Sequence, residues 1–116
     1  MNIIATTIKN LLGKRQGFTK IDEIILVLDV SRNKATGKIK GEVEKKPFEA
    51  KVQEDGYPPA VTDNYFFKRW LRKVKEETHP NMNIVIIYLN YESDEYYLEP
   101  RWEDEQGMKH TKKFYL

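Results

Sequence analysis

The sequence predicts a single α+β domain in which a mostly antiparallel sheet packs with two helices. The 116 residues suit one domain, and an apolar fraction of 40% is enough for a core. Two short segments are apolar at consecutive positions, which is typical of strands buried on both faces. Other segments alternate between apolar and polar residues, and two more repeat at helical spacing. The predicted order along residues 1–116 is α-β-β-β-α-β-β-β.

The first element is a short helix. Ile4, Ile8 and Leu12 recur at helical spacing and predict a helix over residues 3–16, with Gly17 as a stop signal.

Three strands follow. Residues 22–32 ("DEIILVLDVSR") are apolar on both faces, and residues 33–37 ("NKATG") predict a turn in which Gly37 takes a positive φ. Residues 38–44 and 47–53 alternate, so each has one polar face. Pro47 cannot donate to a ladder and indicates a strand start or an edge.

The second half contains a helix and three strands. Residues 64–78 predict the helix, with Thr62 or Asp63 as its cap and His79-Pro80 as its end. Residues 84–91 are again apolar on both faces. The remaining strands are 95–103, in which Pro100 indicates an edge, and 108–116.

The two doubly apolar strands belong in the centre of the sheet, and the alternating strands belong towards its edges. The helices must cover this sheet, because a large apolar face does not stay in water. One helix on each face would do so. Alternatively, both helices share one face and a second subunit covers the other.

The second helix has two distinct faces. An arc of about 140° on a helical wheel predicts core packing for Phe66, Phe67, Trp70, Leu71 and Val74.

The opposite arc holds four cations, and residues 32–46 carry a local charge of +4. These charges are typical of a solvated surface, but a phosphate backbone would also bind such a surface by releasing counterions. The candidate nucleic-acid-binding residues are Lys34, Lys38, Lys40, Lys68, Arg69, Arg72 and Lys75.

Residues 92–105 carry a charge of −6, whereas the whole chain carries +2. Tyrosine and tryptophan lie among these carboxylates, and both provide large contact areas in protein recognition. Cross-strand packing between acidic turns is the structural alternative. The candidate protein-binding residues are Tyr91, Tyr97, Glu99, Arg101, Trp102 and Glu103.

The residues that catalysis requires are scarce. The chain has no cysteine, and its histidines, His79 and His110, have no carboxylate at metal-ligand spacing. We therefore expect no catalytic residue, metal site or cofactor. The N-terminus lacks the features of a signal peptide, and the apolar segments are too short to span a bilayer. The expected location is cytoplasmic, with no membrane contact.

One arrangement points towards an enzyme. Glu49 and Lys51 form a Glu-x-Lys pair on the third predicted strand, and Asp29 or Glu42 supplies another carboxylate. With the order α-β-β-β-α-β over residues 3–91, this resembles the core of the PD-(D/E)xK nuclease superfamily. The resemblance implies metal-assisted phosphodiester hydrolysis. The chain departs from the family pattern because no Pro-Asp pair precedes the motif and Asp29 lies on the first strand.

These observations favour a small non-catalytic binding protein whose partner is another protein. By type it resembles inhibitors, immunity proteins or adaptors, such as those of phages or mobile elements. Binding of nucleic acid is the alternative function, the nuclease is a distant third, and a homodimer is compatible with the pattern of apolar faces.

Overall fold

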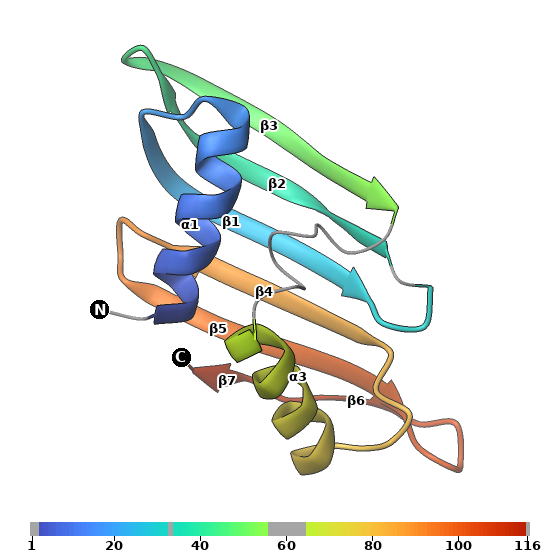
Figure 1. Cartoon of the computed structure of the whole chain (residues 1–116). Helices are drawn as coiled ribbons and strands as arrows, with labels where there is room; N and C mark the ends of the chain where they lie inside the picture. The colour runs from blue at the N-terminus through green and yellow to red at the C-terminus, as the bar shows by residue number, and fades with distance from the viewer. Residues whose placement is uncertain (1–2, 33, 56–64, 116) are drawn as a thin grey trace.

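The computed structural model describes residues 3–32, 34–55 and 65–115. Two helices and a seven-stranded antiparallel sheet confirm the predicted α+β class (Figure 1). The strand order is β3-β2-β1-β4-β5-β6, and β7 pairs with β5. The elements are α1 (Ile3–Gln16), β1 (Lys20–Asp29), β2 (Lys34–Val43), β3 (Lys46–Asp55), α3 (Tyr65–Glu77), β4 (Ile84–Asn90), β5 (Glu95–Glu103), β6 (Lys109–Thr111) and β7 (Phe114–Tyr115).

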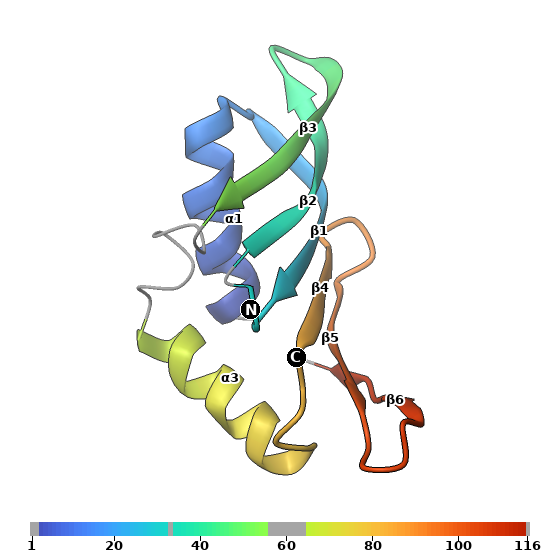
Figure 2. The same ribbon diagram turned by 90° about the vertical axis from the view of Figure 1, so that its right-hand side faces the viewer.

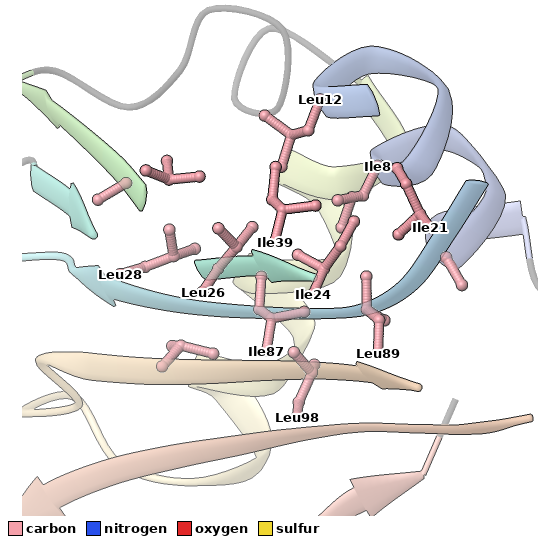
Figure 3. Close-up of a cluster of buried hydrophobic side chains, with 14 of the residues drawn as sticks. Ile8, Leu12, Ile21, Ile24, Leu26, Leu28, Ile39, Ile87, Leu89 and Leu98 are labelled. Carbon is pink, nitrogen blue, oxygen red and sulfur yellow. The ribbon is translucent and has the colours of Figure 1, made fainter. Parts of the chain in front are cut away.

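The two doubly apolar strands lie side by side at the centre, as predicted. β1 pairs with β2 on one side and with β4 on the other. Their alternate side chains build the core in Figure 3, where Leu26 of β1, Ile87 of β4 and the neighbouring Leu98 of β5 have no exposed surface. Burial of such side chains is the main favourable term in folding.

Both helices cover the same face of the sheet, as Figure 2 shows. α1 places Ala5, Ile8 and Leu12 in the core, and α3 contributes the buried Val74 with Leu71 packed beside it. Of the two arrangements that the sequence allowed, the described chain therefore adopts the one that leaves the other sheet face without a helix. The side chains of Phe66, Phe67 and Trp70, which were predicted to join this core, lie outside the described part.

The predicted turn at residues 33–37 is wrong. The turn follows Asp29 directly, because its Oδ1 accepts hydrogen bonds from Ser31 Oγ (2.8 Å) and the Arg32 backbone N–H (3.1 Å). Gly37 lies within β2 opposite Leu26, and its φ is not positive. A Cβ at this position would stand 2.0 Å from the carbonyl oxygen of Ile25. Glycine is needed here for the close approach of two strands rather than for a turn.

Pro100 was predicted to mark an edge, but it is buried in β5, which has β4 on one side and the outer strands on the other. The Pro100 carbonyl accepts a hydrogen bond from Thr111 Oγ1 (3.2 Å), so this residue turns its backbone polar side towards those outer strands. It has no N–H to offer there. The predicted last strand is accordingly divided into β6 and β7, with residues 112–113 between them.

The first strand, predicted over residues 22–32, is shifted to Lys20–Asp29, whereas two other boundaries agree with the sequence. Pro47 is the second residue of the edge strand β3, and α3 ends at Glu77, just before His79-Pro80. The predicted caps Thr62 and Asp63 lie outside the described residues. Neither described helix has the length and apolarity needed to cross a membrane.

Candidate functional site

The sheet face opposite the helices, called the open face below, carries a stripe of apolar side chains along β1 and β4. Strand alternation places these residues there, because their neighbours point into the core. All of them are partly exposed in the structure. This central stripe consists of Ile25, Val27, Ile84, Ile86 and Tyr88.

A row of tyrosines extends the stripe across β5 to β7. Tyr88 is paired with Tyr97, and Tyr97 with Tyr115. The first two rings stack with centroids 4.9 Å apart, and the second pair meets edge-on at 5.9 Å. Lys113 Nζ lies 4.6 Å from the Tyr97 ring centroid. Tyr115 is 66% exposed, so the row ends in an aromatic ring that is open to a partner.

Carboxylates surround these tyrosines. The Tyr88 hydroxyl donates to Glu23 Oε2 at 3.2 Å. The pKa of Tyr97 lies above its ordinary value mainly because of burial; Lys113 opposes the rise, and Glu99 and Glu95 add to it. This flank of the open face, formed by β5 to β7, therefore has acidic groups beside its rings.

The opposite flank, formed by β2 and β3, is richer in lysine. Lys38 and Lys51 lie directly opposite each other, an arrangement of like charges that is unfavourable in isolation. Lys38 forms an ion pair with Glu49 (3.6 Å), whereas Lys51 and Lys40 form no ion pair with any described residue. The open face thus runs from a basic flank, across an apolar centre, to a flank of tyrosines and carboxylates.

The six candidate protein-binding residues divide between the two faces of the sheet. Tyr97, Glu99, Arg101 and Glu103 share the open face, because they alternate along the strand. Trp102 points to the helix side and stacks on His110, with ring centroids 5.6 Å apart.

Tyr91, just beyond β4, also lies on the helix side, and its hydroxyl donates to the carbonyl oxygen of Ala5 in α1 (2.6 Å). Burial raises its pKa far above the ordinary value, with a smaller contribution from Tyr96. Tyr91 and Trp102 therefore have structural contacts and do not join the other four residues.

The candidate nucleic-acid-binding residues are divided as well. Lys34, Lys38 and Lys40 lie on the open face of β2. The exposed Arg69, Arg72 and Lys75 belong to α3, on the other side of the sheet, and the Lys68 side chain lies outside the described part. The sheet separates the two sets, so they do not line one groove.

The residues of the nuclease resemblance are also spread out. Glu49 is paired with Lys40, and Asp29 is paired with Lys34. Because Lys34 and Lys40 are six residues apart in β2, roughly 20 Å of strand separates the two carboxylates. One metal ion cannot bind both. Glu42 lies closer to Glu49, because its partner Pro47 is only two residues away from Glu49 in β3. Within the described residues, no three potential ligands from His, Asp and Glu cluster around a common point.

A hollow of about 540 Å³ lies where β5 meets β6, lined partly by Arg101, Trp102 and His110. His110 Nε2 lies 2.7 Å from Asp104 Oδ2, and this contact is the main reason why the pKa of Asp104 falls below its ordinary value. The backbone N–H groups of Met108 and Gln106 also donate to Asp104. These bonds fix the β5–β6 turn beside the open face.

The central stripe was not among the candidate residues, because its side chains were assigned to a sheet covered on both faces. Strand alternation does identify these side chains as members of one face, but local patterns do not show which layer covers that face. Comparison with protein-family models, with curated proteins and with solved structures finds no match.

Proposed function

We propose that this chain is a non-catalytic protein-binding module and that the open face is its binding surface. The observation that carries the proposal is the uncovered centre of the sheet. Ile25, Val27 and Ile86 are partly exposed there, beside a row of stacked tyrosines. An apolar and aromatic centre with charged residues around it is the usual composition of a protein interface.

The same geometry favours a protein over a nucleic acid. A strand of DNA or RNA would stack its bases on tyrosines and place its phosphates beside them. Here three carboxylates, Glu23, Glu95 and Glu99, would repel phosphates, and Lys113 is the cation beside Tyr97. The arginines of α3 could not assist, because they lie on the other side of the sheet. An inhibitor, immunity protein or adaptor fits this arrangement, since each acts by binding alone.

The test compares tagged wild-type protein with an Ile86→Lys variant in capture experiments from the native host. Placing a charge in the centre of the interface should weaken capture of the partner by roughly 100-fold, because the charge loses its water there. The matched control is Arg72→Glu, which changes an exposed residue on the helix side. Equal capture by all three proteins would contradict the proposal.

Gel shifts across a salt series test the alternative function. Nucleic-acid binding that weakens steeply with salt, and that is lost when Arg69, Arg72 and Lys75 become serine, would replace the proposal. We expect no shift at physiological salt.

A further inference from the structure

The molecule exposes more surface than a compact monomer of its mass. Its accessible surface is 7575 Å², whereas a monomeric protein of 13.8 kDa exposes roughly 6,600 Å². The difference is of the same size as the ~800 Å² that each partner buries in a standard interface. An uncovered sheet face contributes to such a difference, together with the rest of the chain surface.

A second sheet is a natural cover for an open sheet face. Two sheets pack about 10 Å apart with their strands within about 30° of each other. If the second sheet belongs to another copy of the chain, a closed pair requires a two-fold axis lying between the two sheets. That axis runs either across the strands or along them.

The charge layout distinguishes the two axes. An axis across the strands stacks each flank on its own copy, so the lysine-rich β2–β3 flank would face the same flank of the second copy. An axis along the strands, at the seam between β1 and β4, reverses the lateral order. The β2–β3 flank then faces the β5–β7 flank, and the register places Lys40 over Glu95 and Thr36 over Glu99 of the second copy.

We propose that the open face binds a second copy of this chain, with the two-fold axis parallel to the strands at the β1–β4 seam. In this pair β1 lies over β4 of the other copy. Ile25 and Val27 then face Tyr88 and Ile86 of the second copy, because the register aligns Ile25 with Tyr88 and Val27 with Ile86. The interface has an apolar centre and charged flanks, as stable interfaces do.

The flanks supply the specific contacts. Six residues of the open face are paired one after another across the sheet and form one row: Lys51, Lys38, Ile25, Tyr88, Tyr97 and Tyr115. Rotation about the proposed axis brings Lys51 over the exposed Tyr115 of the second copy, and Lys38 over Tyr97, whose ring also has Lys113 beside it. A cation above a tyrosine ring is favourable, and the adjacent carboxylates strengthen the attraction. The close approach of Lys38 and Lys51 is thereby compensated.

Two copies would also form a dimer if the edge strands of their sheets paired, but the edges of this sheet are poorly suited to such pairing. The β3 edge begins with Lys46 and Pro47 and continues with charged side chains such as Lys51, features that disfavour pairing between edges. The outer strands β6 and β7 have only three and two residues.

The experiment reverses the charge of one flank at a time. One variant carries Lys38→Glu with Lys51→Glu, and the other carries Glu95→Lys with Glu99→Lys. Sedimentation velocity over a range of concentrations should show a dimer for the wild type and dimer dissociation constants raised about tenfold or more for each variant alone. An equimolar mixture should restore the dimer, because every flank then faces one of opposite charge.

The control is a charge-matched pair. Arg69→Glu with Arg72→Glu changes net charge equally but acts on α3, so its mixture with the Glu95→Lys, Glu99→Lys variant should gain nothing. Circular dichroism verifies that each variant is folded. If a flank variant does not fold, Ile86→Lys replaces it and should give a monomer.

A wild type that is monomeric at every concentration, or a control mixture that associates equally well, would overturn the self-association. The inference rests on the proposed function because both use the open face, but their failures can be told apart. Capture of a different protein that Ile86→Lys abolishes, by a monomeric wild type, would refute only the second copy as partner.

Discussion

At Gly37 the backbones of β1 and β2 approach so closely that no side chain fits on the helix side. The nearest atom to an added Cβ would be the Ile25 carbonyl oxygen, at 2.0 Å, followed by other backbone atoms of β1. A backbone oxygen in the middle of a ladder cannot move away without breaking its own hydrogen bonds. Gly37→Ala should therefore lower the free energy of unfolding by about 3 kcal/mol or more.

Gly13→Ala is the matched control. An added Cβ there would also be close to another atom, 2.6 Å away, but this atom is Cδ1 at the flexible end of the Ile21 side chain. Alanine also gains about 1 kcal/mol over glycine inside a helix. Urea denaturation should show a small change for Gly13→Ala and a large loss for Gly37→Ala. Similar losses for both would show that the β2 backbone adapts more easily than this geometry allows.

Among the elements, α1 is tied to the sheet by a hydrogen bond as well as by its apolar side chains. The Tyr91 hydroxyl donates to the Ala5 carbonyl at 2.6 Å, and Lys9 of the same helix lies 5.1 Å from the Tyr91 ring centroid. Tyr91→Phe should cost about 1 kcal/mol at neutral pH, because it leaves a helix carbonyl without this donor.

The same residue predicts a pH dependence. The folded pKa of Tyr91 is raised above its ordinary value of 10.0, chiefly by burial. The neutral phenol is thus favoured by folding, and the stabilisation is complete below the ordinary pKa and lost as pH rises towards the raised one. Urea unfolding at pH 8 and pH 11 should show a smaller alkaline loss for Tyr91→Phe than for the wild type. The control is Tyr115→Phe, which removes the phenol of an exposed tyrosine outside the core.

Most elements could be predicted from the sequence because each follows a local rule. Helical spacing gave α1 within its observed bounds, and doubly apolar runs identified β1 and β4 as the centre. The turn before β2 was misplaced because glycine suits both a turn and a close approach of strands. Only the pairing with β1 shows which of these Gly37 provides.

The candidate surface was harder to predict, because it depends on which layer covers which face. Tyr97, Glu99 and Arg101 were named from sequence and lie together on the open face. Tyr91 and Trp102 were named with them but point to the helices. Assigning the helices to one side requires tertiary packing, which residue patterns do not encode. The alternation predicted for each strand was correct, but it did not show which face of the sheet is exposed to solvent.

At the scale of the whole molecule, the free energy needed to open a strand locally should decrease from the centre of the sheet outwards. The amides and carbonyls of β1 are engaged by β2 on one side and by β4 on the other, whereas β3 has a free edge and β6 and β7 are very short. Among the described residues, β6 and β7 contribute one side chain to the packing around the core, Phe114, which is only partly buried. Local opening is easiest where few buried contacts must break.

Native-state hydrogen exchange should therefore rank the strands. Amides of β1 and β4 should exchange only by global unfolding, those of β2 and β5 somewhat faster, and those of β6 and β7 through local fraying. The gap between the slowest and fastest groups should exceed about 100-fold, since each 1.4 kcal/mol of opening free energy corresponds to about tenfold. Protection of Thr111 equal to that of Leu26 would contradict the ranking. That result would show that the outer strands are stabilised as strongly as the centre.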